Sequence, residues 1–222
     1  MTDIINIHTH QLEKDENTFS IYNISLPCKE FPEKIYFSAG WHPWHIEAYN
    51  LSQIDNLLEE VASMKNLLAI GECGLDRVMK INLGKQAEVF RLHIIAAKKY
   101  DKPLIVHCVK AYSDLLQMLK KEKFNGKFVL HNFNGNHDQL DNLLRFDAYF
   151  SLGEQLRNPI SKLNNSLKYI PIERIFLETD DSAFSISETY LFASNLLHIT
   201  IEDLKSQLKQ NFSSFIGGDF GK

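Results

Sequence analysis

Six residues that are able to bind a metal ion follow short apolar segments of this chain, and this arrangement limits the folds that the chain can adopt. They are His8, His10, Glu72, His107, His131 and Asp180. The apolar segments have the length and composition of β-strands. Functional side chains gathered from the C-terminal ends of many parallel strands are typical of a (β/α)8 barrel.

The pattern of apolar residues predicts eight strands, most of them separated by helices. The predicted strands are Ile4–His8, Phe19–Leu26, Ile35–Ala39, Leu67–Gly71, Leu104–His107, Lys127–His131, Ala148–Leu152 and Arg174–Thr179. The predicted helices, which show apolar stripes at helical spacing, are Leu51–Met64, Lys85–Tyr100, Ala111–Lys123, His137–Arg145, Ile160–Ile170, Ser187–Leu197 and Ile201–Phe215. Because strands alternate with helices and number eight, the sequence predicts an α/β fold of the (β/α)8 TIM-barrel type.

The first third of the chain departs from this regular alternation. Only about ten residues separate His8 from Phe19, and fewer separate the second predicted strand from the third. A strand–helix–strand crossover needs roughly ten to twelve residues or more for its connection. The sequence therefore predicts that the first βα connections are trimmed, unless the second strand pairs in another way.

Composition predicts a single domain that covers residues 1–222. The chain is 44% hydrophobic and 23% charged, which is ordinary for a globular protein with one sizeable core. No linker divides it, and no apolar run approaches the roughly 18 residues of a membrane span. Three scattered cysteines favour free thiols and a cytoplasmic location. The formal net charge of −4 shows none of the basic excess of non-specific nucleic-acid binders.

The six residues are stronger evidence together than singly. Residues two apart on a strand share a face, so His8 and His10 can reach one ion. A carboxylate directly after a buried strand, such as Glu72, must be solvated, paired or metal-bound. A lone histidine at a strand end is more often a satisfied core residue. Six ligand types at C-terminal strand ends, with none at N-terminal ends, nevertheless predict a metal centre.

Several ordered motifs resemble those of one enzyme family. They are Asn6–His10, Gly40–Pro43, Gly71–Asp76, the spaced set Gln86, Phe90 and His93, Pro103–His107, His131–Gly135 and Glu178–Asp180. Each motif is weak alone, but the ordered set runs almost from end to end of the chain. The chain resembles the TatD family of metal-dependent hydrolases, within the amidohydrolase-like barrel superfamily.

The resemblance implies a binuclear centre that activates water. It assigns His8, His10 and Asp180 to one metal ion and His107 and His131 to the other, with Glu72 bridging the two. Asp180 and Glu72 would be catalytic, Asp180 as the general base. Mixed imidazole and carboxylate ligands suit Zn²⁺ or Mn²⁺ better than an all-oxygen Mg²⁺ site, although the resemblance leaves Mg²⁺ open.

Four further residues are candidates for substrate contact or for support of the ligands. Asp76 and Glu178 are placed to orient metal-bound imidazoles, although ordinary salt bridges in loops would explain them as well. His42, within the Gly40–Pro43 motif, is a candidate for contact with a substrate phosphate or a part of a structural turn. Asn6 lies two residues before the first ligand and is expected to support it.

Three departures from the family pattern concern the substrate. Asn6 stands where the family usually has Asp, and Cys108-Val109 replaces the usual Ser-Arg after His107, which removes an arginine expected to contact phosphate. The family's Asp-x-Pro is Asp180-Asp181-Ser182 here, and the arginine-bearing loop that follows is largely deleted. The ligand residues are all present, so the sequence supports a metallohydrolase more strongly than a deoxyribonuclease.

Three functions therefore remain open. The leading hypothesis is a metal-dependent phosphodiesterase that cleaves DNA from a strand end. The second is a related hydrolase of another ester, phosphoester or amide, in a small molecule or an aminoacyl-tRNA. The third is a barrel that binds metal without catalysis. None of them involves a membrane or an obligate protein partner.

Overall fold

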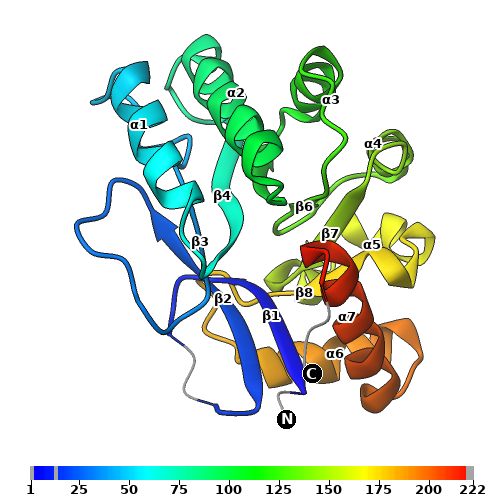
Figure 1. Ribbon diagram of the computed structural model, residues 1–222. Coiled ribbons are helices and arrows are strands. Elements are labelled where there is room, and N and C mark those ends of the chain that lie inside the picture. The colour runs from blue at the N-terminus through cyan, green and yellow to red at the C-terminus, as the bar shows by residue number, and fades with distance from the viewer. Residues whose placement is uncertain (1–2, 13–14, 219–222) are drawn as a thin grey trace. The chain divides into compact units, whose positions relative to one another are not determined.

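The computed structural model describes residues 3–12 and 15–218, and its strands follow one another in the order of the chain (Figure 1). The hydrogen-bonded sheet has the order β1 to β8. The strands are β1 Ile4–Thr9, β2 Thr18–Ser25, β3 Phe37–Gly40, β4 Leu67–Asp76, β5 Leu104–Val109, β6 Phe128–Leu130, β7 Ala148–Leu152 and β8 Ile175–Leu177. This is the topology of a (β/α)8 barrel, and the predicted fold class is confirmed.

Helices separate the strands from β3 onward, and most of them lie close to their predicted positions. They are α1 Leu51–Ala62, α2 Leu83–Tyr100, α3 Tyr112–Lys121, α4 His137–Leu143, α5 Leu163–Ser166, α6 Ile186–Leu197 and α7 Ile201–Ile216. Side-chain caps fix several of their first turns: Asn50 and Ser185, for example, each form a capping box with the residue three positions on.

The predicted trimming of the first connections is confirmed. Among the described residues before β3, no helix connects β1 to β2 or β2 to β3. The second strand nevertheless pairs in parallel with the first, with Ile4 opposite Thr18 and Asn6 opposite Ser20. The alternative in which this strand pairs in another way is therefore excluded.

The predicted helix Ile160–Ile170 is wrong. In its place are the single turn α5 and two 3-10 segments, η1 Glu154–Arg157 before it and η2 Leu167–Tyr169 after it. The Asn164 side chain donates hydrogen bonds to the carbonyl groups of Asn158 and Pro159, and Ser161 donates to Asn134. Such side-chain bonds compete with helical hydrogen bonding, so the apolar spacing alone misled the prediction.

The chain divides into two compact units. Unit 1 combines residues up to Tyr22 with those from Leu130 onward, and unit 2 contains Asn23–Val129. The expectation of one domain over residues 1–222 stays a prediction. In unit 1, α6 and α7 are attached to strands by buried polar groups. The Tyr190 hydroxyl bonds to the backbone of Ile5, and the Asn211 amide donates to the carbonyl groups of Ile172 and Ile175.

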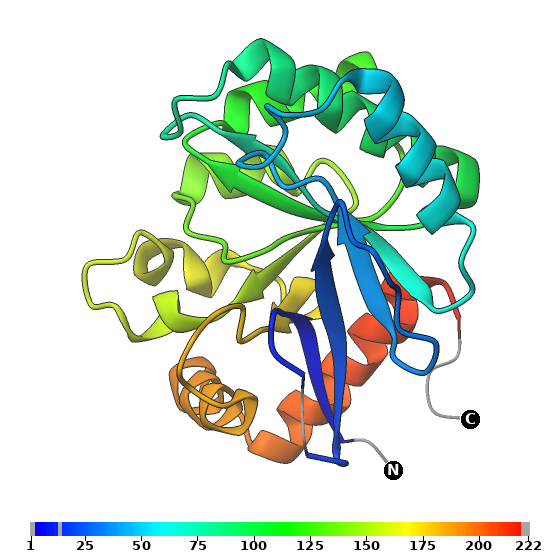
Figure 2. The same cartoon turned by 90° about the vertical axis from the view of Figure 1, so that its left-hand side faces the viewer.

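In unit 2, helices α1 and α2 pack against each other, and α2 packs on β4 (Figure 2). Its core includes Trp41 and Phe90, which are fully buried or nearly so. The Trp41 backbone N–H donates to Nε2 of His93, whose Nδ1 lies 2.8 Å from the Val89 carbonyl oxygen. Because burial disfavours its charged form, the pKa of His93 is lowered to about 4.

No helix among the described residues combines the length and the apolar character that a membrane crossing requires.

Candidate metal centre

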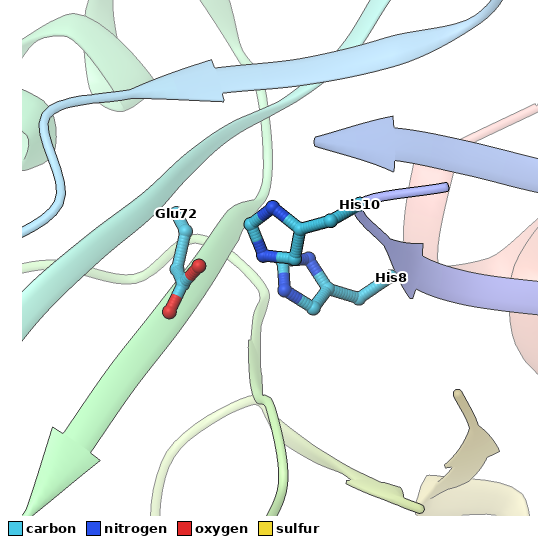
Figure 3. A group of neighbouring side chains, drawn as sticks. All are labelled: His8, His10 and Glu72. Atoms are coloured by element: carbon cyan, nitrogen blue, oxygen red, sulfur yellow. The ribbon is translucent and has the colours of Figure 1, made fainter. Parts of the chain in front are cut away.

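In unit 1, two imidazoles from the end of β1 meet a carboxylate that follows β8. His8 and His10 project from the same end of β1 (Figure 3), and their ring centroids are 5.1 Å apart. Oδ1 of Asp180 lies 3.5 Å from Nε2 of His8 and 3.4 Å from Nε2 of His10. The sequence placed these three residues at neighbouring strand ends, and the structure brings their ligand atoms together.

The backbone of Asp180 is fixed to β1 from both sides. Its N–H donates to the carbonyl oxygen of His8, and its own carbonyl accepts from the N–H of His10. Asp180 has a φ of 51°, a left-handed conformation that is uncommon outside glycine. Residues held in such conformations cluster at functional sites, where the surrounding structure must over-determine them.

Charged and polar neighbours keep Asp180 ionised. Burial by itself raises the pKa of this carboxyl, but contacts with His10 and His8 and the charge of His131 outweigh burial and hold the pKa well below its usual range. An ionised carboxylate is the form that binds a metal ion.

Asn6 supports Asp180 through the preceding residue. Its side-chain oxygen accepts from the N–H of Thr179, and its side-chain nitrogen donates to the Thr179 hydroxyl. That hydroxyl in turn donates to the hydroxyl of Thr9. The amide at this position therefore links the end of β8 to β1 by supplying both a donor and an acceptor.

His131, which follows β6, lies beside His8 and in front of a buried carboxylate. The centroids of the two rings are 4.7 Å apart. Glu178 is fully buried and accepts hydrogen bonds from the Asn132 N–H and the Ser151 hydroxyl. Its Oε1 is 3.8 Å from Nδ1 of His131. Glu178 therefore lies near this imidazole, and its role in orienting His131 stays a prediction.

In unit 2, Glu72 of β4 contacts two imidazoles. Its Oε1 is 3.0 Å from Nε2 of His42 and 3.0 Å from Nδ1 of His107, and all three side chains are buried. Figure 3 shows the Glu72 carboxylate. Sequence reasoning treated His42 as a substrate contact or a turn residue and did not predict its contact with Glu72.

Asp76 orients His107. Its Oδ2 lies 3.2 Å from Nε2 of His107 and also accepts from the indole N–H of Trp44 at 2.8 Å. Burial raises the pKa of Asp76, but hydrogen bonds from Trp44, the Val78 N–H and His107 outweigh it and lower the pKa overall. The side chain of Gln86 fixes the Asp76 backbone by bonding to both its N–H and its carbonyl.

The two glycines that flank Glu72 allow β4 to approach β5. Gly71 and Gly74 have φ values of 142° and 144°, which side chains disfavour. A Cβ at Gly74 would lie 2.0 Å from the carbonyl oxygen of His107, and one at Gly71 would lie 2.3 Å from that of Ile105. These glycines let β4 continue to Asp76, five residues beyond its predicted end at Gly71.

Asn23 of β2 holds the Glu72 backbone and was missed by sequence reasoning. Its buried side-chain oxygen accepts from the Glu72 N–H at 2.9 Å and from the Ser38 hydroxyl at 3.0 Å. The side-chain nitrogen is 3.5 Å from Oε2 of Glu72. A polar residue within a predicted strand was the available signal, but its partner is 49 residues away.

The ligand chemistry fits divalent metal ions. In unit 1 the ligand atoms of His8, His131 and Asp180 lie within 4.8 Å of one another, and in unit 2 the same holds for His42, Glu72 and His107. A neutral His107 that donates from Nε2 to Asp76 presents its Nδ1 lone pair to Glu72. Two lone pairs 3.0 Å apart are stabilised by a shared cation.

His42 has a different role from His107. Its Nδ1 accepts a hydrogen bond from the Trp44 N–H at 3.3 Å, so a neutral ring carries its proton on Nε2. That nitrogen is the one facing Glu72. His42 is therefore arranged to donate a hydrogen bond to Glu72 rather than to bind an ion through Nε2.

A small cavity in unit 1 has a strongly acidic lining. It has a volume of about 120 Å³ and is bordered by four carboxylates, those of Glu154, Glu178, Asp180 and Asp181. Such a lining attracts cations. The cavity therefore agrees with a metal function for the adjoining Asp180.

Comparison with known proteins assigns the chain to a family. Residues 5–217 match the family model described as TatD related DNase. The chain belongs to the TatD family of metal-dependent hydrolases. The resemblance of its motifs to that family is thereby confirmed.

Two relatives and one solved structure show how similar this TatD-family chain is to known proteins. It is 30% identical over 175 residues to an uncharacterized metal-dependent hydrolase of Buchnera aphidicola, covering 75% of this chain and 66% of the relative. It is 30% identical over 161 residues to the 3'-5' ssDNA/RNA exonuclease TatD of Edwardsiella piscicida, covering 69% of this chain and 60% of that protein. The chain thus spans slightly less than two thirds of these relatives.

The structure of a TatD homolog from Escherichia coli superposes with a TM-score of 0.83 at 19% identity, over 96% of this chain and 98% of that one. At this identity the likeness shows the fold alone, and it agrees with the barrel topology of the strands.

Proposed function

We propose that this TatD-family chain is a metal-dependent phosphodiesterase that removes nucleotides from the end of a nucleic acid. The observation that carries the proposal is a repeated arrangement, in which a histidine at a strand end stands in front of a buried carboxylate. It occurs as His131 with Glu178 in unit 1 and as His107 with Asp76 in unit 2. Metal-binding imidazoles almost always have such a partner for their second nitrogen.

The proposed ligands of two divalent ions are His8, His10, Glu72, His107, His131 and Asp180. The distances within each unit support them, because each proposed ligand lies near another imidazole or carboxylate. Zn²⁺, Mn²⁺ and Mg²⁺ are the candidates, and the imidazole-rich set favours the first two. The assignment of individual ligands to each ion, and of Glu72 as a bridge, stays a prediction.

Bound divalent ions would supply an acidified water and stabilise charge on a phosphate. The residues of the chain supply the rest. Asp180 is 26% exposed at its side chain, so its carboxylate can contact a water on its open side, as the proposed general base requires. Glu72 is 4% exposed and fixed from several directions, which suits a ligand that does not move.

A nucleic-acid substrate is supported by the family and by the named relative. The family model is described as a DNase, and the Edwardsiella protein is named an exonuclease of single-stranded DNA and RNA. Both descriptions concern other proteins. They indicate single-stranded DNA and RNA as the first substrates to test.

The test is hydrolysis of end-labelled single-stranded DNA, double-stranded DNA and single-stranded RNA. The protein is first freed of metal with a chelator and then reloaded with Zn²⁺, Mn²⁺ or Mg²⁺. We expect a ladder of products shortened from one end and about two bound ions per chain. Bound metal without cleavage of any nucleic acid would contradict the nuclease proposal while leaving the metal centre intact.

A second candidate function is hydrolysis of a different ester, phosphoester or amide. It is favoured by Cys108-Val109 in place of Ser-Arg after His107 and by the net charge of −4. A panel of p-nitrophenyl phosphodiesters and carboxylic esters would detect it. Turnover of these compounds that exceeds turnover of nucleic acid would replace the leading proposal. Metal binding without turnover of any compound would favour a non-catalytic barrel.

A further inference from the structure

Unit 1 contains a large cavity that shares no residue with the candidate metal centre. It has a volume of about 840 Å³ and is lined by the η1–α5–η2 segment, the start of β8 and the C-terminal part of α6. Figure 1 labels α5 and α6, two of the helices that contribute residues to its lining. Its lining is largely apolar and includes Leu156, Ile172, Phe192 and Leu197. Its volume falls within the roughly 300–1,000 Å³ of small-molecule sites.

The cavity lies beside residues 160–170, which do not form the predicted helix. Beside the single helical turn of α5, apolar side chains at the C-terminal part of α6, Phe192 and Leu197, are only partly buried. Leu196, on the rim of the cavity, remains 40% exposed. Apolar surface left accessible in a concave site is a common mark of ligand binding.

One end of the cavity holds a cation with unused hydrogen-bonding capacity. The guanidinium carbon of Arg157 lies 4.2 Å from the ring centroid of Phe184 and 4.7 Å from that of Phe192. Its Nη2 is buried and has no hydrogen-bond partner among the described residues. Arginine stays charged in proteins, so a buried nitrogen of this kind is costly unless an acceptor reaches it.

Glu188, the acidic residue that is influenced by the charge of Arg157, already accepts hydrogen bonds from another residue. Glu188 feels the charge of Arg157, but its Oε2 accepts hydrogen bonds from the N–H and the hydroxyl of Ser185 at 2.8 Å each. These bonds form the N-terminal cap of α6. Among the described residues Glu188 forms no hydrogen bond with Nη2 of Arg157, which stays open to another acceptor.

The remaining polar lining of the cavity also suits an anion. Besides Arg157 it consists of Lys168, Asn164 and His198, and no acidic residue is among the lining residues in the part of the chain that the structure describes. This lining contrasts with the four carboxylates around the small cavity next to Asp180. The two cavities of unit 1 thus have opposite charge preferences.

We propose that the 840 Å³ cavity binds a small organic anion with a hydrocarbon body. Its acidic head would accept hydrogen bonds from Arg157, and its body would cover Leu156, Phe192 and Leu197. Aromatic rings on two sides hold the guanidinium in place, which lowers the entropic cost of binding. The site is independent of the proposed hydrolase activity, because its lining includes none of the proposed metal ligands.

Titration calorimetry with decanoate and with 1-decanol tests the proposal on the chain of residues 1–222. The two probes have the same hydrocarbon body, but only decanoate is charged. Because charge-assisted hydrogen bonds are worth about 1.5–3 kcal/mol, we expect decanoate to bind at least about tenfold more tightly. Equal affinities, or no binding of decanoate, would overturn the proposal.

Three variants locate the binding. Arg157→Gln should weaken decanoate binding about tenfold and leave decanol binding unchanged, which also shows that the variant is folded. Arg145→Gln, an exposed arginine outside the cavity lining, is the matched control and should change neither affinity. Leu197→Trp should fill the cavity and weaken both probes. An equal loss in the Arg157 and Arg145 variants would show that the anion binds elsewhere and would overturn the assignment.

Discussion

In unit 1 Asp180, a proposed ligand, is attached to β1 through its backbone, whereas in unit 2 Glu72, another proposed ligand, is held by neighbouring side chains. Asp180 exchanges backbone hydrogen bonds with His8 and His10, and its side chain remains 26% exposed. Glu72 is fixed by Asn23 and His42, and its side chain is only 4% exposed. Backbone attachment leaves a carboxylate free to meet water, while a side-chain network fixes its direction. We therefore expect Asp180 to be the reactive group and Glu72 to be the rigid ligand.

The largest expected effect is loss of hydrolysis in Asp180→Asn. Asparagine keeps the size of the side chain and the backbone hydrogen bonds but cannot accept a proton from water. General-base catalysis is worth roughly 10²–10⁴-fold, so kcat should fall by about that factor. The matched control is Asp141→Asn, because Asp141 is an exposed acid paired with His137 on α4. An Asp180→Asn protein with kcat close to wild type would remove the distinction between the two carboxylates.

The roles of the two imidazoles beside Glu72 can be separated by metal content. His107→Gln should lose about one bound ion per chain, since His107 is a proposed ligand. His42→Gln should retain both ions, because the amide of glutamine can replace the hydrogen bond that Nε2 donates to Glu72. Elemental analysis of the dialysed protein measures the number of bound ions per chain in each variant. Equal loss of metal in the two variants would make His42 a ligand.

Removing the carboxylates beside His107 and His131, those of Asp76 and Glu178, tests whether metal affinity falls by the same factor in the two units. Loss of such supporting groups typically weakens metal binding about 10–100-fold. Asp76→Asn should have the larger effect, because Oδ2 of Asp76 is 3.2 Å from the His107 ring, whereas Oε1 of Glu178 is 3.8 Å from that of His131. Competition with a chromophoric chelator measures the affinities. The opposite order would indicate that Glu178 contacts the imidazole more closely in the metal-bound protein.

The smallest expected effect concerns the stability of unit 2 at mildly acidic pH. Burial lowers the pKa of His93 to about 4, from 6.5 in the unfolded chain. Between these values the unfolded state binds more protons, so this contribution to stability is present above pH 6.5 and is lost as the pH falls toward 4. It should shrink by about 1 kcal/mol between pH 7 and pH 5.5. Denaturant unfolding of wild type and His93→Gln at both pH values measures it, and the variant should lack this dependence.

A wild-type protein whose stability difference from His93→Gln does not change with pH would show that His93 is accessible to protons when folded. The packing of Trp41 against α2 would then be looser than the hydrogen bond from its N–H to His93 indicates.

The positions of the six proposed ligands could be read from the sequence because they depend on local patterns. Apolar runs set the strands, and five of these residues fall at or near a C-terminal strand end, whereas Glu72 lies inside β4, which continues to Asp76. The α6 boundary was also close to its prediction, since its capping residue is adjacent in sequence. Departures from the family pattern at Asn6 and after His107 were likewise visible without a structure.

Other features depended on residues far apart in the chain. Asn23 supports Glu72 across 49 residues, and Asn6 supports Thr179 across 173. Which ring nitrogen of His42 carries the proton follows from two contacts, one between Nδ1 and the Trp44 N–H and one between Nε2 and Glu72. The spacing of apolar residues does not predict such pairs, because each of these polar residues, taken alone, has nothing in the sequence that identifies its partner.

Sequence by itself therefore determined the strand order, the fold class and the family of this protein. Tertiary structure decided how each proposed ligand is oriented, and it placed turns and short helical segments, beside a cavity that Arg157 lines, where the helix Ile160–Ile170 was predicted. The physical reason is the range of the interactions involved. Apolar periodicity is a local property of the chain, whereas a buried hydrogen bond is satisfied only by whichever distant partner the folded chain brings to it.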